Sequence, residues 1–169
     1  KGKKILSGSI NISGSKNATL PILAAAILTD KFLTLSNIPL VKDVYTMISL
    51  LKFIGLDIEI FKKKNTLNIS NNKKLKTIAP YNLLKTMRAG VLVLGPLLAK
   101  YKKAKVSLPG GCAIGTRPVN LHLFALEKLG AKIKIKNGYI HASAKNGLKG
   151  SIIRFPTISV GATENAILA

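Results

Sequence analysis

The sequence predicts an α/β fold built from a repeated unit of helix, strand, helix, strand and strand. Residues 43–60 align without a gap on residues 118–135, and in each stretch an apolar helix ends at a glycine before an alternating strand. Residues 66–70 match residues 139–143 in the same way, so the unit recurs after about 75 residues. Self-similar units of this size stack to share one core.

The first unit follows a polar N-terminal stretch. Residues 4–13 alternate isoleucines with Ser, Gly and Asn, which is typical of a short strand pair. An apolar helix is expected over residues 18–28. Pro21 is tolerated only in the first turn of a helix, so Lys16 and Asn17 are expected at or just before its start. The remaining expected elements are a strand at 32–37, a helix at 44–54 ended by Gly55, and strands at 57–61 and 66–70.

The second unit repeats this plan and a third begins it. The second comprises a helix at 87–99, a strand at 105–108, a helix that starts at Pro118, and two strands equivalent to those that close the first unit. The third starts at residues 151–155 and stops inside its first helix. A helix face without its following strand and second helix cannot be buried, so we expect this segment to be marginally stable or to depend on further chain. The repeats are therefore expected at 14–75, 76–147 and, incomplete, 148–169.

Composition argues against several function classes. The net charge is +21, but 24 of the 27 basic residues are lysine, which AT-rich codons favour, so mutational drift can supply much of the charge. Nucleic-acid interfaces usually gather Arg, Lys and aromatic residues on one face, whereas here the lysines are scattered and only nine residues are aromatic. We therefore expect no nucleic-acid partner, although small anionic substrates would be attracted.

Neither a membrane nor an oxidising compartment is expected. The longest apolar runs, residues 20–28 and 91–99, fall far short of the roughly 20 residues that a membrane helix needs, and the N-terminus lacks signal-peptide order. The single cysteine cannot form an internal disulfide. These features favour a cytoplasmic location.

A glycine-rich loop within residues 107–122 is where we expect the chemistry. Its glycines let the backbone around Cys112 approach a ligand closely, and Arg117 precedes the start of a helix. A thiol beside a guanidinium suits reaction with an anionic substrate, while a buried structural cysteine in a turn is the alternative. His122 is expected either to pack partly buried or to support the loop as a polar group.

Few other side chains offer catalytic chemistry. Two histidines, with no CxxC or HExxH motif, predict that no metal is bound. Six acidic residues leave little room for a carboxylate pair, and we expect no carboxylate near the loop that could act as a base. Cys112, His122 or a lysine would therefore have to act as the general acid or base.

Four segments resemble, in the same order, segments of one known family. They are SGSKNA at 13–18, YNLLKTMRA at 81–89, LPGGCAIGTRPVNLH at 108–122 and SVGAT at 159–163. The family is that of the UDP-N-acetylglucosamine 1-carboxyvinyltransferases, which are bacterial enolpyruvyl transferases. Chains of this family are more than twice as long, so the resemblance covers their N-terminal part only.

The resemblance implies a fold of two similar domains, each with three repeats around buried helices, called an inside-out α/β barrel or enolpyruvyl transferase fold. Residues 1–13 would be a strand of the second domain, and residues 14–169 would be the substrate-binding domain that carries the loop. The general base for the sugar hydroxyl and further cationic residues would lie in the second domain. The chain alone is therefore expected to be inactive, and a full-length protein is expected to be a monomer.

The implied reaction transfers the enolpyruvyl group of phosphoenolpyruvate to the 3'-hydroxyl of UDP-N-acetylglucosamine and releases phosphate, with no cofactor. It opens peptidoglycan synthesis, and with it cell-wall formation, cell shape and division. By matching positions, Cys112 would donate the proton, add to phosphoenolpyruvate and be the target of fosfomycin. Lys16, Arg88 and Arg117 would hold phosphoenolpyruvate. The residues matched to UDP-N-acetylglucosamine contacts are Asn17, Arg88, Arg117, Pro118, Val119, Asn120, Leu121, Ser159, Val160 and Gly161.

Two departures from the family pattern bear on nucleotide affinity. Asn120 stands where the family usually has Asp, and Thr157 stands where a lysine is common.

Two alternative functions also stay open. The shikimate-pathway enolpyruvyl transferase shares the repeat fold but lacks the cysteine loop, and a noncatalytic basic module would bind nucleic acid instead.

Overall fold

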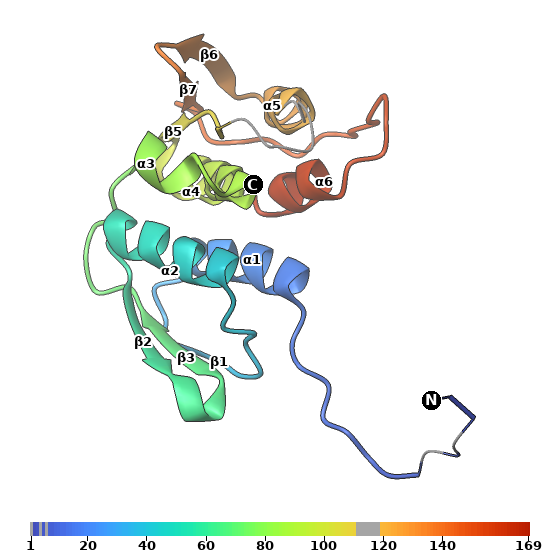
Figure 1. The fold of residues 1–169 in the computed structure, drawn as a ribbon. Coiled ribbons are helices and arrows are strands. Elements are labelled where there is room, and N and C mark those ends of the chain that lie inside the picture. Colours follow the sequence, from blue (N-terminus) through green and yellow to red (C-terminus); the bar gives the residue numbers. More distant parts are fainter. Residues whose placement is uncertain (1, 4, 6, 111–118) are drawn as a thin grey trace.

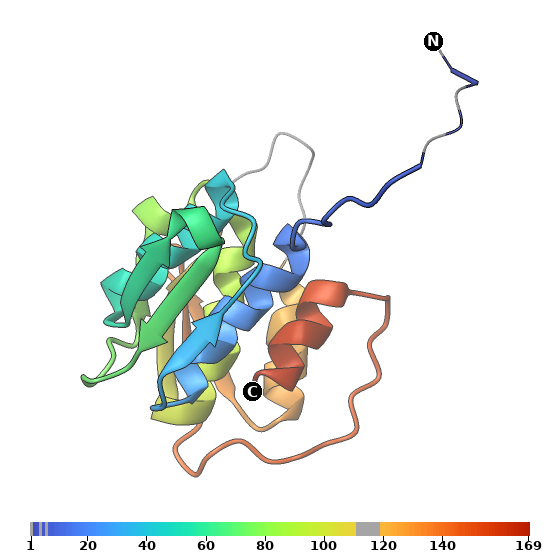
Figure 2. The same ribbon diagram turned by 90° about the horizontal axis from the view of Figure 1, so that it is seen from below.

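The computed structural model describes residues 2–3, 5, 7–110 and 119–169. Two sheets lie at opposite sides, and helices fill the space between them (Figure 1). The described residues before Lys16 have no regular structure, and those before Ile12 run away from this body (Figure 2). Ile12 and Gly14 are held to it by hydrogen bonds with the side chain of Asn37. The strand pair predicted at 4–13 is therefore absent from the part of that range that is described.

The first unit contains one three-stranded sheet and its helices. Its elements are α1 (Lys16–Ala25), the 3-10 helix η1 (Ala26–Leu28), β1 (Leu33–Leu35), α2 (Lys42–Ile54), β2 (Asp57–Phe61), the 3-10 helix η2 (Lys62–Lys64) and β3 (Thr66–Ser70). The strands are antiparallel in the order β1-β3-β2, with Leu33 opposite Ile69 and Ile58 opposite the same residue. These three side chains lie on the face that the helices cover.

The second unit repeats this arrangement with one added strand. Its elements are β4 (Ile78–Ala79), α3 (Tyr81–Leu84), the 3-10 helix η3 (Arg88–Val93), α4 (Leu94–Tyr101), β5 (Lys103–Ser107), α5 (Asn120–Lys128), β6 (Lys132–Lys136) and β7 (Tyr139–Ser143). The order is β4-β5-β7-β6, so β7 lies between β5 and β6 as β3 lies between β1 and β2. A last helix, α6 (Val160–Ile167), packs against α5, α4 and η3. The predicted α/β fold class is confirmed.

The core lies between the sheets and is built mainly by the central helices. Their side chains of lowest exposure include Leu23 on α1, Met47 and Leu51 on α2, and Leu97 on α4, each fully buried. A contiguous apolar cluster joins the two units, so they share one core, as stacked repeats do. Among the described residues, none of the helices is both long and apolar enough to cross a bilayer.

Two predicted helices have different starts from those expected. α1 begins at Lys16 because the Ser15 hydroxyl accepts a hydrogen bond from the Ala18 amide at 3.4 Å. Pro21 consequently lies beyond the first turn, and the carbonyl of Asn17 loses its usual helical donor. The expectation for Pro21 was wrong, whereas Lys16 and Asn17 do lie at the helix start.

The helix predicted at 87–99 is also different, because it is divided into η3 and α4. Pro96 has no amide to donate to the carbonyl of Leu92, so a continuous α-helical ladder is interrupted there. Residues 151–155, at which the third unit is expected to start, form no helix or strand.

Replacing Gly55 with alanine should destabilise the fold by about 1 kcal/mol. Gly55 ends α2 at φ +125°, and an added Cβ would lie 3.3 Å from Leu75 Cδ2. Urea unfolding would measure the loss. Gly150→Ala is the matched control, because no atom lies within 4 Å of the added Cβ at that position. Equal stability of the two variants would contradict the role given to Gly55.

Candidate functional site

Sequence-predicted residues from three segments meet around one hollow of about 360 Å³. The segments are η3, the residue before α5, and the first turn of α6. The predicted residues that line the hollow are Arg88, Val119, Ser159, Val160 and Gly161. The other lining residues are Ala89, Val91, Leu92, Pro109, His122 and Glu164.

Two helices begin at this hollow, which favours negatively charged ligands. Val119 is the N-cap of α5, and Ser159 is the N-cap of α6. Unpaired amides and the helix dipole make such termini partly positive, and the guanidinium of Arg88 adds a full positive charge. The wall of the hollow is therefore suited to bind an anion. α1 begins on the same side of the molecule as α6 (Figure 2).

The start of α6 is held by its own N-cap. The Ser159 hydroxyl accepts a hydrogen bond from the Ala162 amide at 3.3 Å, and the Thr163 hydroxyl donates to the Ser159 carbonyl at 2.9 Å. Gly161 leaves room for the ring of His122, since an added Cβ would lie 3.3 Å from His122 Cε1. The small size of Gly161 therefore lets α6 approach α5 closely at the hollow.

Substituting alanine for Ser159 should lower the free energy of unfolding by about 1 kcal/mol, because the first turn of α6 loses its side-chain acceptor. Thermal and urea unfolding would measure this loss. Ser151→Ala makes the same change at an exposed position outside any helix or strand and should be nearly neutral. An equally small effect at Ser159 would show that the cap contributes nothing.

Burial changes the acid–base behaviour of two side chains in the hollow. Burial, together with the positive charge of Arg88, lowers the pKa of His122 from 6.5 to about 4. Burial also raises the pKa of the Glu164 carboxyl. His122 is therefore neutral at physiological pH.

Glu164 places a carboxyl group at the hollow. The expectation that no carboxylate near the loop could act as a base concerns a role, and it stays a prediction. Glu164 lies one helical turn after Val160 on α6, so both side chains reach the same hollow. The i, i+4 spacing in the sequence could have indicated this. His122 is partly buried and lines the hollow, which agrees with the predicted packing role. Its support of the loop stays a prediction.

Other predicted residues lie elsewhere or are not described. Lys16 and Asn17 are exposed at the start of α1 and are not among the residues that line the hollow. Lys16 Nζ forms an ion pair with Asp43 Oδ2 at 2.8 Å, with both side chains partly exposed. Asn120 and Leu121 open α5, and Thr157 is exposed before α6. Cys112, Arg117 and Pro118 lie outside the described residues.

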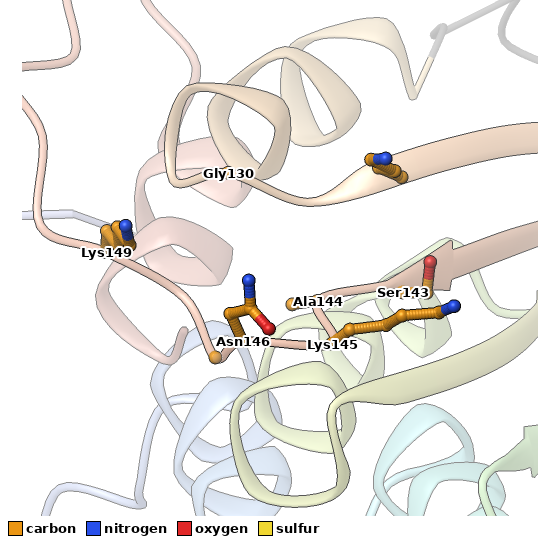
Figure 3. A pocket seen from close by; sticks show the side chains of 8 residues that line it. Gly130, Ser143, Ala144, Lys145, Asn146 and Lys149 are labelled. Atoms are coloured by element: carbon orange, nitrogen blue, oxygen red, sulfur yellow. The ribbon is translucent and has the colours of Figure 1, made fainter.

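A second hollow, of about 480 Å³, lies at the opposite end of α5. Lys145 and Lys149 reach it from opposite sides of Asn146, next to Gly130, which follows α5 (Figure 3). None of the sequence-predicted residues that the structure describes lines this second hollow.

Across the described ranges, no three His, Cys, Asp or Glu side chains gather as a metal site would require.

Comparison with known proteins gives the family. The model of the family described as EPSP synthase (3-phosphoshikimate 1-carboxyvinyltransferase) matches residues 1–169. This chain belongs to the EPSP synthase family. Members that are similar in sequence include the UDP-N-acetylglucosamine 1-carboxyvinyltransferase of Pelagibacter ubique, 64% identical over 168 residues, and that of Vesicomyosocius okutanii, 57% identical over 164 residues. These alignments cover 99% and 97% of this chain but only 40% and 39% of the relatives.

Two solved structures, one of an EPSP synthase and one of an enolpyruvyl transferase, have the same fold. The EPSP synthase from Acinetobacter baumannii superposes with a TM-score of 0.72 at 17% identity, covering 99% of this chain and 39% of that chain. The enolpyruvyl transferase NikO from Streptomyces tendae gives a TM-score of 0.71 at 17% identity, covering 85% of this chain and 31% of that one. At these identities the likeness concerns the fold alone, and it agrees with the enolpyruvyl transferase fold that the sequence predicts.

Proposed function

We propose that this chain forms the loop-bearing, substrate-binding part of an enolpyruvyl transferase. The reaction moves the enolpyruvyl group of phosphoenolpyruvate to the 3'-hydroxyl of UDP-N-acetylglucosamine and releases phosphate. The observation that carries the proposal is the 64% identity, along nearly the whole chain, to a relative named for that reaction. The matched cysteine loop favours this reaction over that of the shikimate pathway.

The geometry of the hollow supports an anionic substrate. Two helix N-termini and Arg88 face it, and both substrates of the proposed reaction carry phosphate groups. In this proposal Ser159, Val160 and Gly161 contact the UDP-sugar, together with Asn17 and residues 117–121. Lys16, Arg88 and Arg117 hold phosphoenolpyruvate, and Cys112 supplies the proton and the reactive thiol. Fixed cations of this kind stabilise charge as it develops during reaction.

In this proposal the full-length protein needs no cofactor and is a monomer that acts in the cytoplasm. It takes part in the synthesis of cell-wall precursors and does not bind nucleic acid.

The chain spans about 40% of the length of its relatives, so turnover is best tested in a chimera. In that chimera, this chain replaces the matching 40% of the Pelagibacter ubique relative.

The chimera should release phosphate only when phosphoenolpyruvate and UDP-N-acetylglucosamine are both present. The unmodified relative is the control for assay conditions. Release with 3-phosphoshikimate in place of the UDP-sugar would support the shikimate-pathway alternative. Salt-sensitive binding of the 169-residue chain to random DNA, with no UDP-sugar binding, would support the noncatalytic alternative.

A further inference from the structure

One buried asparagine on α6 joins three segments of the site. Asn165 is fully buried, and its carboxamide lies between η3, α4 and α5. Its Oδ1 accepts a hydrogen bond from the Gly95 amide at 2.9 Å. Its Nδ2 donates to the Val91 carbonyl at 3.3 Å and lies 3.1 Å from His122 Nδ1.

The two backbone contacts fix the orientation of this carboxamide. In a continuous α-helix the Gly95 amide would donate to the Val91 carbonyl, four residues earlier. Here η3 meets α4 and that bond is missing. The side-chain carboxamide of Asn165 replaces it, since it accepts from the Gly95 amide and donates to the Val91 carbonyl. A flipped carboxamide would set its NH₂ group against the Gly95 amide and its oxygen against the Val91 carbonyl. Both pairs would repel, so the nitrogen must be the atom that faces His122.

The orientation of Asn165 in turn determines the protonation of His122. One hydrogen of Nδ2 goes to Val91, which leaves the other for His122. An NH₂ group donates and cannot accept, so Nδ1 of His122 must carry a lone pair. In a neutral imidazole the proton is then on Nε2. This nitrogen lies on the ring edge nearest Gly161, at the wall of the hollow, since a Cβ added at Gly161 would be 3.5 Å from it.

We infer that Asn165 is a positioning residue that locks His122 as the neutral Nε2–H tautomer, so that His122 offers the hollow a hydrogen-bond donor and not a base. A ligand that uses this contact must present an acceptor, such as a phosphate or carbonyl oxygen. The lock itself is independent of the proposed function. Only the identity of the acceptor, an oxygen of phosphoenolpyruvate or of the UDP-sugar, rests on it.

The pKa of His122 agrees with this arrangement without being needed for it. An imidazolium would direct a second N–H at the Asn165 NH₂ group, so protonation would break the contact. The Arg88 guanidinium and burial also oppose that charge. Among the described residues that line the hollow, Glu164 is the one whose side chain can carry a negative charge.

Nitrogen-15 NMR of the 169-residue chain at neutral pH tests the lock. We expect the His122 signals of a protonated Nε2 and an unprotonated Nδ1, and a coupling through the hydrogen bond between Asn165 Nδ2 and His122 Nδ1. His141, exposed on β7, supplies an internal reference. A protonated Nδ1, or the absence of the coupling, would overturn the inference without any variant.

Asn165→Asp tests the same lock by substitution. A carboxylate can accept from the Gly95 amide and from His122, but it can no longer donate to the Val91 carbonyl. His122 should therefore gain a proton on Nδ1. Asn146→Asp, the same change at an exposed residue, should leave the His122 spectrum unchanged. An unaltered Nε2–H tautomer in Asn165→Asp would show that another group fixes the ring. Failure of the chimera to turn over substrate would instead reject the proposed function and leave the tautomer result standing.

Discussion

Replacing Cys112 with alanine in the chimera is expected to reduce the rate of enolpyruvyl transfer by about 10²–10⁴-fold, the range typical for loss of a general acid. Alanine can neither donate a proton nor add to phosphoenolpyruvate. Phosphate release under saturating substrates would measure the loss. Cys112→Asp is the matched variant, and it should be milder because a carboxylic acid can still donate the proton.

The same thiol should be alkylated by fosfomycin, and peptide mass spectrometry should locate the adduct at Cys112. Loss of activity should follow adduct formation, and Cys112→Asp should escape both. A Cys112→Ala variant that keeps full activity and is still inhibited would refute this assignment.

Acid should destabilise the fold through His122 by about 3 kcal/mol between pH 6.5 and pH 4. The pKa of His122 is about 4 in the folded chain and near 6.5 in the unfolded chain. Between these values the unfolded state binds the proton and the folded state does not, so stability falls as pH falls. Above pH 6.5 this contribution is constant.

Urea unfolding at several pH values would give the free energy of unfolding as a function of pH for the wild type and for His122→Gln. The effect is the difference between the slopes of these two curves. Glu164, whose pKa is raised by burial, is present in both proteins, so its contribution cancels to a first approximation. Parallel stability curves across this range would contradict the low pKa of His122.

Most of the strands, although not β4, could be predicted from the sequence because their signals are local. Alternation along 57–61 and 66–70 and the glycine after α2 each fix a short piece of backbone, and the second unit repeats them. The division of the helix at 87–99 also has a local cause in Pro96. The partner that bridges that division does not, because Asn165 lies 70 residues beyond Gly95.

The candidate site was predictable in part for the same reason. Matched segments identified Arg88, Val119 and residues 159–161, and the fold brings them to one hollow. Glu164 was missed although it follows Val160 by one helical turn, a spacing that brings both side chains to the same side of α6. Lys16 and Asn17 begin α1 as predicted, yet their part in the site stays a prediction.

The bridge made by Asn165 has a consequence for synthesis on the ribosome. A nascent chain that has emerged only as far as residue 150 contains every strand of both sheets, but it lacks the carboxamide that joins η3 to α4 and the helix that walls the hollow. Folding during translation proceeds from the N-terminus, so both sheets can form before the hollow is complete. Only when α6 has emerged is the hollow complete and the junction of η3 and α4 bridged by the side chain of Asn165.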